Sequence, residues 1–142
     1  MYGSTTEVAY LARMWTLDGS WTTATNPTAA QVTTWLTSVS SMVDIALQGA
    51  GFVTPVVLAA AVDAIDMLVN GIVADLCHAA NSSGRFFTER IVERGLSPMI
   101  MVNHQIANWV AEWTTGLTQM GVPRVSVPTS TQNFSIPPRK QL

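Results

Sequence analysis

The segment from Pro55 to Ala80 constrains the fold of this chain more than any other part of the sequence. Its large apolar residues recur at helical spacing, so at about 100° per residue they fall on one broad face. These residues are Leu58, Val62, Ile65, Leu68, Val69, Ile72, Val73 and Leu76. Thr54 is placed to cap such a helix, and Pro55 would occupy its first position, where no backbone N–H is needed. A helix that is apolar over most of its circumference is covered by other helices. The sequence therefore predicts an all-α fold, a small helical bundle around this central helix.

A narrow polar stripe runs along the opposite side of the predicted central helix. Asp63, Asp66 and Asn70 lie there at i, i+3 and i+7, flanked mostly by alanines. A membrane span is the competing interpretation, because about 20 apolar residues suffice to cross a bilayer. Three aspartates and an asparagine within the segment would each be costly in lipid, so we expect a soluble domain and no membrane partner. Asp63 and Asp66 are expected to face solvent, a lumen or a subunit interface.

Charged residues are too few to cover the surface of a domain of this size. Of the 142 residues, 11% are charged and 48% are hydrophobic, whereas charged residues usually make up about 25%. Part of the surface is therefore expected to be buried against partner chains. The alternative is a monomer covered by Thr, Ser, Asn and Gln side chains. Between Met14 and Gly84 there are five aspartates and no Lys or Arg, while six basic and three acidic residues follow from Arg85 onward. This pattern lacks the clustered cations that nucleic-acid binding requires.

Two helices are predicted before the central one. Thr5 or Thr6 can cap a short first helix. Its buried face would hold Val8, Leu11, Ala12 and Trp15. A loop follows, in which Trp21 is expected to pack onto the body. The second helix is expected from about Pro27 to Gln48, with a possible capping box at its start.

The second helix has a clear apolar face and a clear end. The face comprises Val32, Trp35, Leu36, Val39, Met42, Val43 and Ala46, with Thr28 and Gln31 at the spacing of the capping box. Gly49 and Gly51 are expected to end the helix. The central helix would begin four residues after Gly51. Such a short connection predicts that the two helices are near-antiparallel neighbours.

Two further helical segments are predicted after the central helix. The first is short and highly charged, and it is either solvated or part of an interface between subunits. Its charged residues are Arg85, Glu89, Arg90, Glu93 and Arg94. The last helix begins at Ser97 and Pro98, as a cap and a first helical position. Its packing stripe is Met99, Val102, Ile106, Trp109, Trp113 and Leu117.

The sequence changes character from Gly121 onward, which divides the chain into a helical domain, residues 1–120, and an arm, residues 121–142. Four of the seven prolines lie in the arm, and no helical period survives there. An extended, partly apolar segment gains fixed structure by lying on another surface. The arm is therefore predicted to bind a partner through Arg124, Val125, Val127, Phe134, Ile136, Arg139 and Lys140.

No pattern in the sequence predicts catalysis, a cofactor or a metal site. It contains no Gly-rich phosphate loop, G-x-S-x-G elbow, H-E-x-x-H motif or cysteine pair. Asp75, Cys77 and His78 are ligand-type residues, but at i, i+2 and i+3 they cannot all point the same way. His104 has no suitable partner nearby, and Cys77 is expected to be a buried thiol. The N-terminal residues have neither the basic region nor the apolar run of a signal peptide.

The order of these segments is itself informative. A Pro-Thr-initiated helix containing VTTWLTSVSSMVDIAL is followed by a glycine break, GFVTP, a long Ala-rich helix and a short extended tail. Over roughly residues 26 to 120, this arrangement resembles the head–tail adaptor (connector) proteins of tailed bacteriophages. The chain departs from many such proteins in its long Pro-rich C-terminus and its poverty in lysine.

The resemblance implies a small structural protein rather than an enzyme. Members of this family form a dodecameric ring below the portal and use terminal segments to clasp their neighbours. The implied partners are other copies of the chain, the portal protein and a tail-completion or stopper protein, with DNA only as passing cargo. The implied location is the neck of the virion, after assembly in the host cytoplasm. An excess of aspartates would suit the lumen of such a ring.

Two other classes remain open at this point. One is a different minor capsid or tail-completion protein. The other is a helical bundle that binds a small ligand, with Trp109 and Trp113 lining its pocket. Such a tandem pair at i, i+4 is more often part of a core or an interface.

Overall fold

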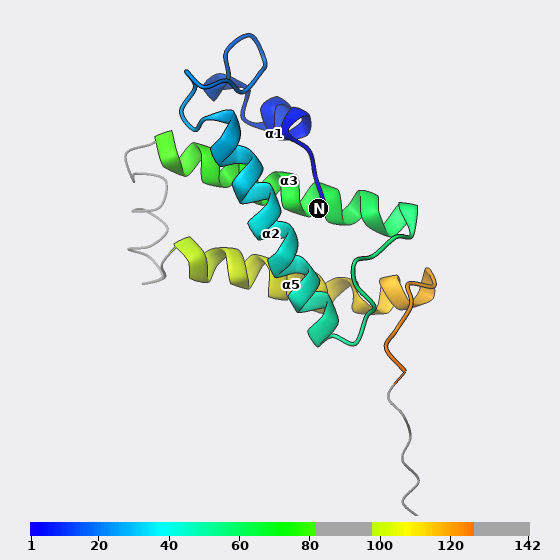
Figure 1. Cartoon of the computed structure of the whole chain (residues 1–142). Coiled ribbons are helices and arrows are strands. Elements are labelled where there is room, and N and C mark those ends of the chain that lie inside the picture. The colour runs from blue at the N-terminus through cyan, green and yellow to red at the C-terminus, as the bar shows by residue number, and fades with distance from the viewer. Residues whose placement is uncertain (82–97, 127–142) are drawn as a thin grey trace, which may run out of the picture.

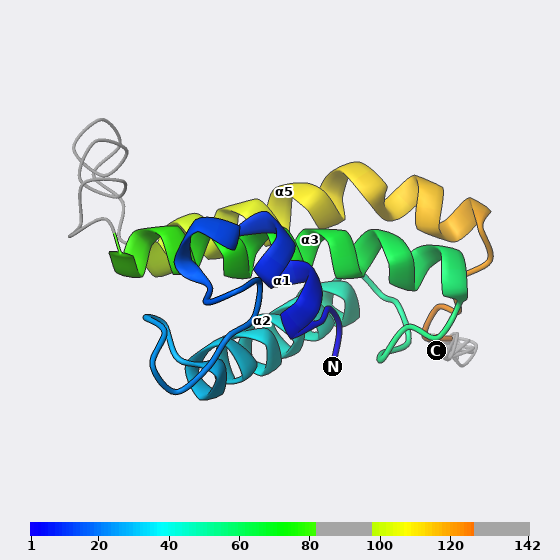
Figure 2. The same ribbon diagram turned by 90° about the horizontal axis from the view of Figure 1, so that it is seen from above.

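The computed structural model describes residues 1–81 and 98–126. Within these ranges the chain is all-helical and forms no β-strand. The elements are helix α1 (Thr5–Leu11), the 3₁₀ turn η1 (Arg13–Trp15) and helices α2 (Ala29–Gly49), α3 (Ala59–Asn81) and α5 (Pro98–Gln119). Helices α3 and α5 run antiparallel beside each other, and α2 crosses both of them obliquely (Figures 1 and 2). The short α1 packs on α3, next to α2.

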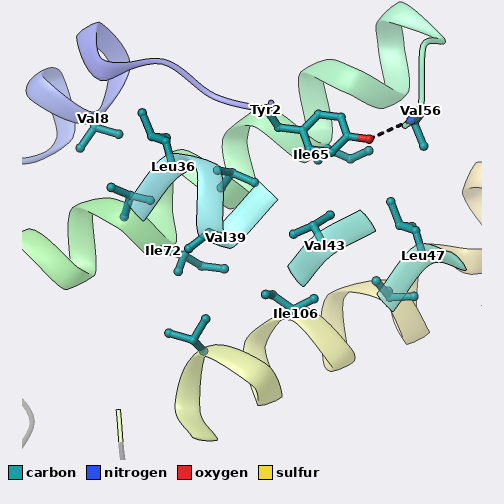
Figure 3. Close-up of a cluster of buried hydrophobic side chains, with 14 of the residues drawn as sticks. Tyr2, Val8, Leu36, Val39, Val43, Leu47, Val56, Ile65, Ile72 and Ile106 are labelled. Carbon is teal, nitrogen blue, oxygen red and sulfur yellow. Dashed lines mark hydrogen bonds between the residues drawn. The ribbon is translucent and has the colours of Figure 1, made fainter. Parts of the chain in front are cut away.

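The predicted central helix is confirmed, because α3 contacts α1, α2 and α5. Ile65, Val69 and Val73 are fully buried along one side of α3. Leu36 and Val43 of α2 are fully buried with them, and Figure 3 shows both beside Ile65 in the core. Burying a side chain of this size stabilises the fold by about 1.5–3 kcal/mol relative to leaving it exposed. The core therefore lies where α2 crosses the pair formed by α3 and α5.

The start of α2 matches the sequence prediction. The Thr28 side chain accepts a hydrogen bond from the backbone N–H of Gln31 at 3.4 Å, and the Gln31 side chain accepts one from the backbone N–H of Thr28 at 2.9 Å. This reciprocal capping box satisfies two backbone donors that a helix start leaves unpaired. The predicted apolar face of α2 is also the one that faces the core.

The start of α3 differs from the prediction, which placed Thr54 and Pro55 at a helix N-terminus. The helix begins at Ala59, and Pro55 lies in an extended connection after a cis peptide bond. The reason lies in the backbone donors of this connection. The Val53 N–H donates to the Pro123 carbonyl at 2.9 Å, and the Val56 N–H donates to the Tyr2 hydroxyl at 2.8 Å. These tertiary partners replace the first turn of a helix.

The prediction that α2 and α3 are near-antiparallel neighbours is wrong, because the connection between them is longer than expected. Residues 50–58 separate the two helices, and a connection of this length does not force a tight helical hairpin. Oblique crossing lets α2 bury its apolar face against α3 and α5 together (Figure 1).

The first helix and the loop after it follow the prediction in part. Ser4, and not Thr5 or Thr6, caps α1, because its hydroxyl accepts a hydrogen bond from the Glu7 N–H at 3.2 Å. Val8 and Ala12 are buried as expected, but Leu11 is 55% exposed. The prediction for Trp21 is confirmed: its indole N–H donates to the Thr5 carbonyl at 3.1 Å, and its ring packs against the core.

Helix α5 begins at Pro98, as predicted, and the chain then folds back onto its own body. Val122 is buried, the Pro123 carbonyl accepts from Val53, and the Val125 N–H donates to the Gly51 carbonyl at 2.9 Å. The first residues of the predicted arm therefore belong to the helical body.

Several predictions lie outside the described residues. They concern Arg85, Glu89, Arg90, Glu93 and Arg94 in residues 82–97, and Val127, Phe134, Ile136, Arg139 and Lys140 in residues 127–142. Among the helices that are described, none combines the length and the apolar character that crossing a membrane requires.

Candidate functional site

Two shallow depressions lie next to each other on the surface of α3. The first, the α3–α5 groove, has a volume of about 460 Å³. The second, the α1–α3 depression, has a volume of about 290 Å³. Met67 of α3 lines both and is 79% exposed. Together they form one continuous surface, which we call the acidic face because five carboxylates line it.

The α3–α5 groove has an apolar floor and a polar rim. We call floor the buried and half-buried apolar residues of its lining, which are Leu68, Gly71 and Ile72 of α3 together with Trp109 of α5, and rim its polar residues. The rim residues are Asp75 of α3 and Gln105, Asn108 and Glu112 of α5. Both walls are helices, so helical spacing fixes which side chains enter the groove.

The two predicted tryptophans do not play equal parts in this groove. Their rings stack with centroids 5.4 Å apart and an interplanar angle of 11°. Trp109 is partly buried against the core and lines the groove, whereas Trp113 lies outside the lining and is 42% exposed. The stack supports the orientation of the Trp109 ring at the floor.

The α1–α3 depression contains the polar stripe that the sequence placed on α3. Leu11 and Met67 provide its apolar part. Its polar lining consists of Glu7, Asp63, Asp66 and Asn70. Asp63 is exposed, as expected for a solvent-facing edge, but Asn70 is buried. The stripe therefore has a structural role along part of its length.

That structural role is to hold the residues before α1. The Gly3 N–H donates to the Asp66 carboxylate at 2.7 Å, and the Ser4 N–H donates to the Asn70 side-chain oxygen at 2.9 Å. Gly3 has a φ of +74°, and a Cβ there would lie 2.5 Å from the Asn70 oxygen. Only glycine fits this approach without strain.

Tyr2 completes this anchor and was not identified from the sequence. Its hydroxyl donates to the Asp44 carboxylate at 2.7 Å. The same hydroxyl accepts a hydrogen bond from the Val56 N–H, as Figure 3 shows. Its backbone N–H donates to the Ser40 hydroxyl at 2.9 Å. Burial, reinforced by the hydrogen bond to Asp44, raises the pKa of Tyr2 to about 12. A tyrosine at the second residue carries no local signal for contacts made with α2 and with the α2–α3 connection.

The charged residues that line the acidic face are all negative. The described residues include seven Asp and Glu but only two Lys and Arg. Five of these seven carboxylates line the two depressions: Glu7, Asp63, Asp66, Asp75 and Glu112. Neither lining contains a Lys or an Arg. Negative charges without neighbouring cations, placed around an apolar floor, favour a partner that is cationic and partly apolar.

The geometry provides no reactive centre on this face. Neither lining contains a His, Cys or Ser that could act with a carboxylate. Cys77 is fully buried, and burial raises its pKa to about 12, so its thiol is held in the neutral form. The Nδ1 atom of His78 accepts a hydrogen bond from the Trp15 indole N–H at 2.8 Å. No group of three potential metal ligands occurs in residues 1–81 and 98–126.

Two residues of the predicted arm fall within the described chain. The Arg124 guanidinium lies 5.0 Å from the centroid of the Phe52 ring and donates to the Ala50 carbonyl at 2.9 Å. Arg124 therefore contacts its own chain, while the Val125 side chain is exposed. Contact of either residue with a partner stays a prediction.

Further large apolar side chains are exposed on the first helix and directly after it. Tyr10 of α1, Met14 of η1 and Leu17 in the loop that follows are all exposed. The chain matches no protein-family model, and no curated protein or solved structure is significantly similar to it.

Proposed function

We propose that this chain is a structural protein that assembles with copies of itself, and that the acidic face is one of its contact surfaces. The observation that carries this proposal is the exposure of Leu11 and Met67 between carboxylates, on a surface that continues into a groove with an apolar floor. Contiguous exposed apolar surface with a polar rim is typical of interaction sites. The low share of charged residues, 11%, supports the same conclusion.

Within this class, the resemblance of residues 26 to 120 favours a head–tail adaptor of a tailed bacteriophage. Such a protein forms a ring in the neck of the virion, between the portal and a tail-completion protein, and DNA passes through it. For Asp63 and Asp66, the neighbouring Leu11 and Met67 favour a subunit interface over the lumen. Apolar side chains at a wet lumen would remain in water, whereas an interface buries them.

Sedimentation of the full chain over a range of concentrations tests self-assembly. The wild-type chain is expected to form oligomers, and the double substitution Leu11→Ser with Met67→Ser is expected to weaken them. Ile45→Ser is the matched control, because Ile45 is 70% exposed on α2 and lines neither depression. A strictly monomeric wild-type chain, alone and with portal particles, would contradict the proposal. Electron microscopy of the oligomers then shows whether they are rings.

A second candidate function is the binding of a small organic molecule in the α3–α5 groove. The groove volume of about 460 Å³ falls within the range of roughly 300–1,000 Å³ that is usual for ligand sites. Trp109 provides an aromatic wall for such a ligand. A ligand-dependent change in tryptophan fluorescence that disappears in Trp109→Phe would favour this candidate over assembly.

A further inference from the structure

The α3–α5 groove lies on the side of α3 that faces away from α2. Met67 lines the groove, and it is two residues from both Ile65 and Val69, which are fully buried in the core. In a helix, residues two apart point in nearly opposite directions. None of the residues that line the groove belongs to α2. Within the described chain, this side of the α3 and α5 pair is therefore not covered by a third helix (Figure 2).

The charges of the groove restrict what can cover it. Asp75 and Glu112 stand on opposite rims, and Met67 links the groove to the depression that holds Asp63 and Asp66. Two copies of this face placed against each other would bring like charges together, which is unfavourable. A matching surface has apolar side chains for the floor and cations for the rims.

The chain contains one segment with this composition. Residues 127–142 include Arg139 and Lys140 and no Asp or Glu. Their apolar residues include Val127, Phe134 and Ile136. Prolines at positions 128, 137 and 138 disfavour a helix. An extended segment of this kind binds by placing apolar side chains in pockets and its charges at the rim.

We propose that the α3–α5 groove binds residues 127–142 of a second copy of the chain. The last described residues before this segment lie beside the end of α2, on the other side of the fold from the groove. The Val125 N–H donates to the carbonyl of Gly51, which lies just after the end of α2. Phe52 and Arg124 form an isolated antiparallel β-bridge next to this bond. Occupation of its own groove would require the segment to pass around α3 or α5, whereas a neighbouring copy can present its groove directly. This inference rests on the proposed self-assembly, and it names the segment and the groove through which two copies contact each other.

Photo-crosslinking in the full chain tests the proposal. Phe134 is replaced by the photoreactive residue p-benzoylphenylalanine, and equal amounts of ¹⁴N- and ¹⁵N-labelled chains are mixed before irradiation. The expected products join position 134 of one chain to groove residues, such as Leu68 and Trp109, of another. In these products one peptide carries ¹⁴N and the other ¹⁵N, which identifies a crosslink between two chains. The same photoreactive residue at Ile45, an exposed position on α2, is the control and is expected not to label the groove.

Charge substitutions give a second, independent readout. The double substitution Asp75→Asn with Glu112→Gln is expected to reduce mixed-isotope crosslinking about two- to tenfold, as for the loss of two exposed ion pairs. Asp18→Asn is the matched control, because Asp18 is exposed in a loop and lines neither depression. Circular dichroism establishes that all variants are folded.

The outcomes separate this inference from the proposed function. Crosslinks from position 134 to other surfaces, or to the groove only within one chain, would overturn the inference even if sedimentation shows oligomers. Equal crosslinking in the charge variant and its control would also overturn it. A monomeric chain in sedimentation would overturn the proposed function itself.

Discussion

At the scale of single residues, Tyr2 makes contacts that no neighbouring residue can replace. Its hydroxyl joins Asp44 of α2 to the Val56 N–H of the connection. Tyr2→Phe leaves that buried N–H without its acceptor, so we expect the free energy of unfolding to fall by about 1–3 kcal/mol. Urea titration measures this loss. Tyr10→Phe is the control, because Tyr10 is 68% exposed, and a similar loss there would contradict the explanation.

The pKa values of Tyr2 and Cys77 predict how stability depends on pH. Burial raises the pKa of Tyr2 from 10.0 to about 12 and that of Cys77 from 9.0 to about 12. In both cases the unfolded chain loses its proton first as the pH rises. The stabilising contribution is therefore complete below pH 9.0 and is lost between pH 9.0 and about 12. Urea titrations at rising pH check this, and the decline should be smaller in Tyr2→Phe. An equally steep decline in that variant would be evidence against the assignment.

At the scale of elements, the capping box at the start of α2 has a measurable energy. Thr28→Ala removes the side-chain acceptor of the Gln31 N–H, so we expect a loss of about 0.5–2 kcal/mol in the free energy of unfolding. Thr33→Ala is the matched control. Thr33 is exposed within α2 and bonds only to the Ala29 carbonyl of its own helix. If both variants lost equal stability, the cap would not be the cause.

The segment after α5 provides a second prediction for an element. Val122 is buried, and Pro123 and Val125 make backbone hydrogen bonds to the α2–α3 connection. At concentrations low enough for the chain to be monomeric, removal of residues 127–142 is therefore expected to leave the thermal midpoint of the body unchanged, whereas removal of residues 122–142 lowers it. Circular dichroism during heating measures both. Equal midpoints for the two truncated chains would show that residues 122–126 do not contribute to the fold.

At the scale of the whole molecule, most of the buried apolar residues of the described chain form one core cluster that includes residues from α1, α2, α3 and α5. Because α3 contacts all the other described helices, none of them can leave without exposing part of that core. We expect unfolding in one cooperative transition. Circular dichroism and tryptophan fluorescence should then give the same midpoint in urea. Two separated midpoints would show that part of the bundle unfolds independently.

The sequence by itself determined the all-α class, the central helix, the capping box, the buried face of α2 and most of that of α5, where Trp113 was predicted to pack but is 42% exposed. These features depend on side chains a few residues apart, for which helical periodicity is a sufficient guide. Cys77 was also predicted correctly, because a lone cysteine on an apolar helix is most often buried. The predicted helix in residues 82–97 and the outer part of the arm lie outside the described residues.

Only the tertiary structure decided how α3 starts, what holds the N-terminal residues and where the acidic face lies. Thr54 and Pro55 have the local pattern of a helix start, but Val53 and Val56 find hydrogen-bond partners in residues far along the chain. Asn70 on the polar stripe is buried, and its side chain accepts a hydrogen bond from the N–H of Ser4, 66 residues away in sequence. The groove exists because α2 covers only one side of the α3 and α5 pair. Contacts between residues distant in sequence have no local periodicity, and their energy is realised only when the elements pack.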